Sequence, residues 1–187
     1  MFHITVKGIK SHKRRQFIKL ATQHMLASLV NHRMHIDLEI QFCELAKREN
    51  GIIGLCDVQD HGRNPRMFIV EIDSNISFFD QLLTIAHELV HVKQFAKNEL
   101  YQYCKNERTR WRNKVYDKLS YSKQPWEREA YRKQYKILHE FVTKHSDICW
   151  LFILSNPDLF NINRGDDISS QEQIDDEIQT IRGAKSL

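Results

Sequence analysis

Three residues near the middle of the chain, His87, Glu88 and His91, have the types and the spacing of a metal centre. They lie in an apolar stretch, residues 80–95, that reads DQLLTIAHELVHVKQF. On an α-helix, residues i and i+4 lie one above the other with Cβ atoms ~5–6 Å apart, so both imidazoles can face one ion. The carboxylate of Glu88 can then reach water on that ion. Packing alone gives little reason for an acid between two histidines. The pattern predicts a zinc centre with Glu88 as the catalytic base.

A third protein ligand is needed, because catalytic zinc sites usually combine three side chains with an open position. The candidates are Glu127 and Glu129, in the segment PWEREAY, and His139. The two glutamates are two residues apart, or ~200° around a helix, so they are not expected to share one site. His139 lies roughly 18 Å along a helix from Glu127, which makes it a further alternative. Spacing alone favours Glu127 only slightly.

One large class of zinc peptidase is excluded by the residues after His91. The extended metzincin pattern requires Gly and His where this chain has Gln94 and Lys97.

The elements that must position these residues follow an α+β pattern. A short strand at residues 2–6 is followed by a helix that Ser11 can cap and that extends to Asn31. Three strands are then expected, at residues 35–43, 52–58 and 67–72. A polar turn between the second and third strands favours a hairpin. Either strand of this hairpin is a candidate edge for an extended peptide. His61, in the turn, is read as an exposed loop residue.

Two further helices carry the candidate ligands. Ser77, with Asp80 three residues later, can cap the central helix, whose apolar residues lie all round it, as in a buried helix. Pro125 suits a first helical turn, and residues 126–144 are expected to form the second helix, with Glu127 at its start.

The segment between these two helices, residues 101–123, mixes tyrosines and a tryptophan with lysines and arginines. Residues 101–135 hold ten bases against four acids, an excess larger than the net charge of +4 of the whole chain. Such a segment can contact DNA, or it can cover the active-site helix with long basic side chains. A second basic cluster at the start of the first helix is interpreted as a solvated face; its members are Lys10, Lys13, Arg14, Arg15 and Lys19.

Composition limits the remaining possibilities. With 187 residues, 41% hydrophobic and 28% charged, the chain fits one globular domain, expected at residues 1–155. Residues 156–187 hold seven acids and three bases and are expected to form a flexible acidic tail. No apolar run approaches the ~20 residues of a membrane span, and we expect a cytoplasmic protein. The scattered cysteines form no C-x-x-C pair and are expected to be reduced: Cys43, Cys56, Cys104 and Cys149.

The three segments HELVHVKQ, RWRNKVYD and PWEREAY together resemble the SprT-like and phage-encoded zinc metallopeptidases of the zincin type. In related gluzincin-like proteins, including the ImmA/IrrE group, the third ligand begins a Glu-x-x-Ala-(Asp/Asn) pattern. Residues 127–130 fit this pattern, so the resemblance implies Glu127 as the ligand. Tyr131 departs from it, which puts in doubt the hydrogen bond that steadies the first histidine.

The resemblance implies a minimal zincin-like fold. In it, an N-terminal helix and a small, mostly antiparallel sheet pack on the helix with the two histidines, and the second helix carries the third ligand. The expected activity is hydrolysis of a protein or peptide by zinc-activated water, with Glu88 as general base. Tyr121, Tyr131 and His139 are candidate donors to the oxyanion. The alternatives are a basic nucleic-acid-associated protein with a structural metal, or a protease recruited to DNA.

Overall fold

The computed structural model describes residues 1–60, 62–103, 108–156 and 159. The chain divides into two units, Met1–Phe141 and the remainder from Val142. The acidic tail expected at residues 156–187 lies almost entirely outside the described residues, as do His61 and Cys104.

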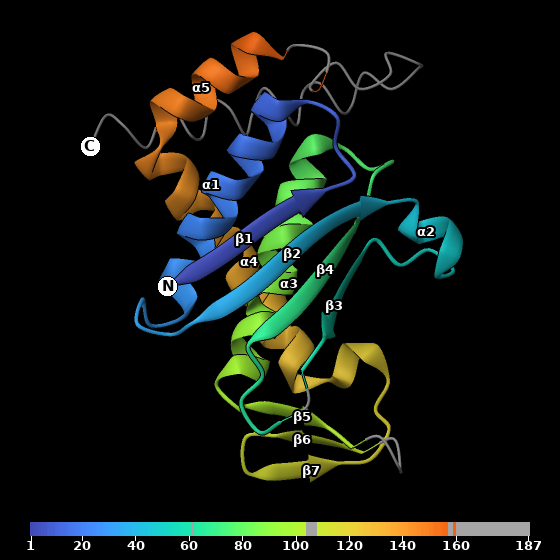
Figure 1. The fold of residues 1–187 in the computed structure, drawn as a ribbon. Coiled ribbons are helices and arrows are strands. Elements are labelled where there is room, and N and C mark those ends of the chain that lie inside the picture. Colours follow the sequence, from blue (N-terminus) through green and yellow to red (C-terminus); the bar gives the residue numbers. More distant parts are fainter. Residues whose placement is uncertain (61, 104–107, 157–158, 160–187) are drawn as a thin grey trace, which may run out of the picture. The chain divides into compact units, whose positions relative to one another are not determined.

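A four-stranded sheet with the strand order β1-β2-β4-β3 forms the centre of the first unit. Three helices, α1 (His12–Leu29), α3 (Phe78–Ala96) and α4 (Pro125–Lys144), lie on one face of it (Figure 1). Every second residue of β2 is buried, as the sequence pattern predicted. The short helix α2 (Leu45–Arg48) follows β2. The strands are β1 (Phe2–Lys7), β2 (Ile36–Cys43), β3 (Gly54–Val58) and β4 (Met67–Asp73).

The expectation of a mostly antiparallel sheet on α3 is wrong. Strand β2 runs parallel to both β1 and β4, and within this sheet only β3 and β4 pair antiparallel. Helix α1 connects β1 to β2 as a crossover, which returns the chain to the same end of the sheet. The hairpin predicted between β3 and β4 is confirmed. Strand β3 is an edge strand, whereas β4 is internal, so β4 is excluded as a docking edge.

Helix α3 is buried along nearly its whole length, as predicted. Fifteen of its nineteen residues are buried, and it contacts α1, β3, β4 and β5. The hydroxyl of Ser77 accepts a hydrogen bond from the backbone N–H of Asp80 at 3.0 Å, which confirms the predicted cap. Polar side chains on such a helix need internal partners, because water does not reach them.

A second, three-stranded antiparallel sheet fills most of the segment between α3 and α4, and these strands were not predicted. Its inner face packs against α4 through a cluster of Leu100, Trp111 and Trp126. The short 3-10 helix η1 (Tyr121–Lys123) leads from this sheet into α4. The strands are β5 (Leu100–Gln102), β6 (Thr109–Trp111) and β7 (Lys114–Tyr116).

The basic cluster on α1 is partly structural. Arg14 donates to Gln81 Oε1 at 2.5 Å, and Arg15 donates to the carbonyl oxygens of Ile9 and Lys10. The exposed members are Lys10, Lys13 and Lys19.

In the second unit, helix α5 (Ser146–Ser155) follows α4 along the chain. Within the described residues, no helix has both the length and the apolar character that crossing a membrane requires.

Candidate metal centre

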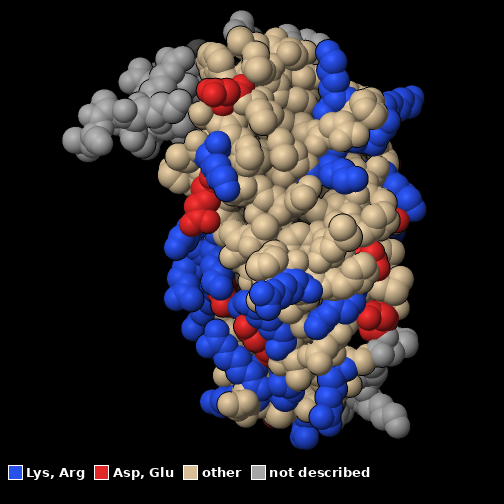
Figure 2. All heavy atoms as spheres, turned by 60° about the vertical axis from the view of Figure 1, so that its left-hand side comes forward, with Lys and Arg blue, Asp and Glu red and all other residues tan. Residues whose placement is uncertain are grey.

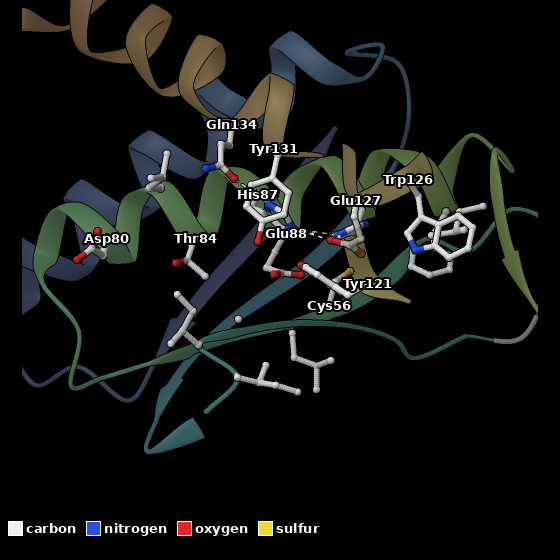
Figure 3. Close-up of a pocket in the computed structure, with 18 of the residues that line it drawn as sticks. Cys56, Asp80, Thr84, His87, Glu88, Tyr121, Trp126, Glu127, Tyr131 and Gln134 are labelled. Atoms are coloured by element: carbon white, nitrogen blue, oxygen red, sulfur yellow. Dashed lines mark hydrogen bonds and ion pairs between the residues drawn. The ribbon is translucent and has the colours of Figure 1, made fainter. Parts of the chain in front are cut away.

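Two neighbouring helices bring His87, His91 and Glu127 together. Figure 3 shows His87 on α3 facing Glu127 on α4. The Nε2 atoms of the two histidines are 3.2 Å apart, and the oxygens of Glu127 lie 3.2 Å and 3.3 Å from them. All three side chains are buried. The histidines lie one turn apart on α3, and Glu127 is in the first turn of α4. Two imidazole nitrogens and a carboxylate at these separations could hold one metal ion.

The other candidate ligands lie elsewhere. Glu129 lies 3.1 Å from Lys93 Nζ and 3.1 Å from Lys133 Nζ, so its charge is already matched by cations. His139 is exposed and does not line the cavity beside the three ligand groups. Of the three alternatives, Glu127 is the residue that the structure places beside both histidines.

A chain of hydrogen bonds fixes the orientation of His91. Its Nδ1 lies 2.9 Å from Gln94 Oε1, and an amide oxygen only accepts, so Nδ1 donates and Nε2 faces Glu127. Gln94 is itself held, because its Nε2 donates to the carbonyl of Trp126 and to Glu129, both at 3.0 Å. Such supporting groups fix the tautomer and ring orientation of a metal-ligating histidine.

Gln134 supports His87 in the same way, at 2.8 Å from Nδ1. The family pattern suggested Asp or Asn at position 131 for this bond; here the Tyr131 ring packs edge-on against the His87 ring, with centroids 4.7 Å apart. Sequence reasoning missed Gln134. The usable signal was its spacing, since Glu127, Tyr131 and Gln134 follow the i, i+4, i+7 repeat of one helix face.

Glu88 lies beside the three ligand groups and lines the same cavity. It is buried, and burial raises the pKa of its carboxyl, although the nearby histidines lower it in part. A Cβ atom on Gly54 of β3 would lie 2.7 Å from Glu88 Oε1 and 2.4 Å from Thr84 Cγ2. Glycine at this position therefore lets the edge strand approach α3 at the carboxylate.

Electrostatics couple the ligand groups strongly. Burial raises the pKa of Glu127, but hydrogen bonds from His87 and His91 outweigh it and hold that pKa well below its usual range. Burial lowers the pKa of His91, and the hydrogen bond to Glu127 outweighs this and brings the pKa to about 9. Burial, followed by hydrogen bonds to Glu127 and Tyr131, raises the pKa of Tyr121. A bound divalent cation would take the place of the proton that these groups share.

The cavity beside these groups has a volume of about 570 Å³. Its walls come from α3, α4, η1, β5 and the edge strand β3. Of the expected oxyanion donors, Tyr121 and Tyr131 line it. Cys56 lines it as well, and burial raises the pKa of this thiol, which keeps it protonated at neutral pH.

The described residues thus hold a buried His/His/Glu group, a glutamine on the outer nitrogen of each histidine, and a further carboxylate in the adjoining cavity. Comparison of the chain with protein-family models, with curated proteins and with solved structures finds no significant match.

Proposed function

We propose that this chain is a zinc-dependent metallopeptidase of the zincin type, as its resemblance to SprT-like and ImmA/IrrE proteins implies. One observation carries the proposal: Glu127, forty residues from His87, lies 3.2 Å from its Nε2. Two histidines and a glutamate form a known ligand set of catalytic zinc, with a fourth position open to water. The α+β arrangement of α3 beneath a sheet with β3 at its edge is compatible with a minimal zincin-like fold.

The donor set supports zinc over calcium or magnesium. Three ligands of nitrogen and oxygen character suit zinc, whereas calcium and magnesium prefer oxygen ligands alone. His87, His91 and Glu127 would hold the ion, with Gln134 and Gln94 fixing the two imidazoles. A zinc ion at this position would lower the pKa of its bound water toward ~7 and polarise the scissile carbonyl.

Glu88 acts as general base in this mechanism. Its carboxylate accepts a proton from the attacking water and delivers it to the nitrogen of the leaving amine. A raised pKa favours the first transfer, because a carboxylate that is too acidic would not take the proton from water. The Tyr121 hydroxyl, which lines the cavity and helps to lower the pKa of Glu127, is a candidate donor to the oxyanion.

The substrate is proposed to be an extended peptide. Strand β3 has an outer edge beside the cavity, and its backbone groups can pair with an added strand. Ile52 and Ile53, just before β3, and Leu55 within it line the cavity and are 46%, 43% and 37% exposed, which favours apolar side chains in the substrate.

Zinc analysis combined with a peptide-library digest tests this proposal. We expect about one zinc per chain in the wild type and in Glu88→Gln, and much less in Glu127→Ala, because only the last change removes a ligand. The Glu88→Gln variant should lose hydrolysis by a factor of ~100 or more, since general-base catalysis contributes ~10²–10⁴-fold. Glu140→Gln, at an exposed position of α4, is the matched control and should change neither quantity.

Two outcomes would contradict the proposal. Equal zinc content in wild type and Glu127→Ala would remove Glu127 as the third ligand. Unchanged hydrolysis in Glu88→Gln would refute the mechanism while leaving the metal centre in place.

A further inference from the structure

The residues from Arg108 to Lys133 divide their charges between the surface and the interior. Nine of them are basic, and each is exposed or half-buried. Three are acidic, but Glu127 and Glu129 are buried at 8% and 6% exposure, which leaves Asp117 as the exposed carboxylate of this range. Most of the charged side chains exposed in this range are therefore positive. Figure 2 shows lysines and arginines gathered over the lower part of the molecule, where Figure 1 places β5, β6 and β7.

The three-stranded sheet presents one face to the protein interior and one to solvent. Leu100 pairs with Trp111 across β5 and β6, and both are buried at 3% and 8% exposure. The next row, Tyr101, Arg110 and Val115, points the opposite way, because side chains alternate along a strand. We call this second side the outer face.

Aromatic rings and a guanidinium lie together on the outer face. Tyr101 and Tyr103 are 38% and 37% exposed, and their rings meet edge to face with centroids 5.0 Å apart. The guanidinium of Arg110 lies 5.8 Å from the centre of the Tyr101 ring and is held by hydrogen bonds to Asn98. Backbone pairing of Tyr103 with Arg108 continues this arrangement beyond β5 and β6.

We propose that the outer face of the three-stranded sheet, with the basic side chains around it, binds single-stranded nucleic acid. Exposed tyrosines can stack on bases of any sequence, and surrounding cations can track the phosphates. A duplex keeps its bases stacked and would leave these ring faces unused. An acidic protein would use the cations but would gain little from a tyrosine pair with an arginine beside it.

The surface is separate from the proposed catalytic site. Leu100 and Gln102, which point inward from β5, line the cavity beside the metal centre, whereas Tyr101 lies between them and points outward. Binding on the outer face therefore requires neither a metal ion nor Glu88.

Fluorescence anisotropy with a labelled oligo(dT) of ~20 nucleotides tests the proposal on the full chain, because a site of this kind covers ~4–16 nucleotides. Affinity should fall steeply with salt. Replacing three cations by Gln should reduce the slope of log K against log salt by about 2, since each phosphate contact on a single strand contributes ~0.7. The three positions are Arg108, Arg110 and Lys118. The matched control, with the same change in charge on and just before α1, is Lys10, Lys13 and Lys19 to Gln, and its slope should stay close to that of the wild type.

Substitutions at Tyr101 test the contribution of base stacking separately from that of charge. Tyr101→Leu should weaken binding ~10-fold with an unchanged salt slope, because stacking of one base contributes ~1–3 kcal/mol. Tyr101→Phe, which keeps the ring, should bind within about twofold of the wild type. Both substitutions keep a residue that strands accept, and unchanged zinc content in each variant reports an intact inner face.

Three results would overturn the proposal: Tyr101→Leu binding as tightly as the wild type, a duplex of equal length binding more tightly than the single strand, or poly-glutamate displacing the oligonucleotide at equal charge concentration. The last would identify an acidic protein as the partner. The Glu88→Gln variant should bind the oligonucleotide normally, so failure of the peptidase proposal leaves this one standing.

Discussion

The first turns of α4 and the strands before it place opposite charges in opposite environments. Carboxylates point inward, where Glu127 and Glu129 each meet fixed partners at hydrogen-bonding distance. Cations such as Arg128 and Arg132 point outward and are exposed. A buried charge acts through individual bonds, so losing one partner has a large effect. Exposed charges act through their summed field, so each contributes little and the contributions add. Substitutions in the two regions should differ accordingly.

The largest effect is expected at Gly54, where the edge strand approaches Glu88. In Gly54→Ala, the added Cβ would lie 2.7 Å from Glu88 Oε1, so the carboxylate must move. We expect hydrolysis to fall ~100-fold, because a displacement of ~1 Å at a reacting group can cost that much. Zinc content should remain that of the wild type, since Gly54 touches no ligand. Loss of zinc and hydrolysis together would show that the strand supports the whole centre rather than Glu88.

The next largest effect is expected at Gln94 and Gln134, the glutamines that hydrogen-bond the two histidines. Gln94→Ala and Gln134→Ala should each weaken zinc binding ~10–100-fold, as measured by competition with a chromophoric chelator, because each leaves an imidazole without its orienting partner. Gln94→Ala should be the more severe, since Gln94 also bonds Glu129 and the carbonyl of Trp126. Gln124→Ala, on the approach to α4, is a control of equal size. Zinc affinity unchanged in both glutamine variants would mean that packing alone orients the rings.

A smaller and pH-dependent effect is expected at Glu129. Burial raises its pKa, but bonds from Gln94, Lys133 and Lys93 outweigh this and bring the pKa to about 2, below the ordinary 4.5. A lowered carboxyl pKa stabilises the fold above pH 4.5, and this contribution disappears as the pH falls through 2. In metal-free protein at pH 7, Glu129→Gln should lower the free energy of unfolding by ~2 kcal/mol.

Urea denaturation from pH 7 downward measures this difference, which should shrink in acid. The surface counterpart, Arg132→Gln, should change the free energy of unfolding by less than ~0.5 kcal/mol at any pH. Equal effects at the two positions would contradict the contrast between inward and outward charges.

Local patterns predicted the three long helices α1, α3 and α4 and how they begin, because those signals lie within a few residues of one another. Ser77 with Asp80, and Pro125 before Trp126, are examples. The direction of β2 depended on a crossover through α1, and no short-range signal encodes it. The small sheet was missed because its strands are only three residues long, which is too short for an alternating pattern to stand out.

The same distinction holds at the centre itself. The spacing of His87, Glu88 and His91 was enough to predict their roles. The sequence hardly distinguishes Glu127 from Glu129, because the two differ mainly in the residues that surround them in the fold. Lys93 distinguishes the two glutamates, because its Nζ lies 3.1 Å from Glu129 and forms an ion pair with that carboxylate. Gln134 belongs to no sequence motif, and its role becomes visible only where α4 packs beside α3 and brings it to His87.

The packing of Trp126 against Leu100 and Trp111 has a consequence for the order of folding. Trp126 directly precedes Glu127, so the three-stranded sheet helps to position the carboxylate that would complete a metal centre. The two histidines are in place as soon as α3 forms, because they lie four residues apart on one helix. We expect the carboxylate to reach its position only once β5 and β6 have paired and packed on the tryptophan. The rate of metal binding during refolding should then report the docking of the small sheet rather than the formation of α3.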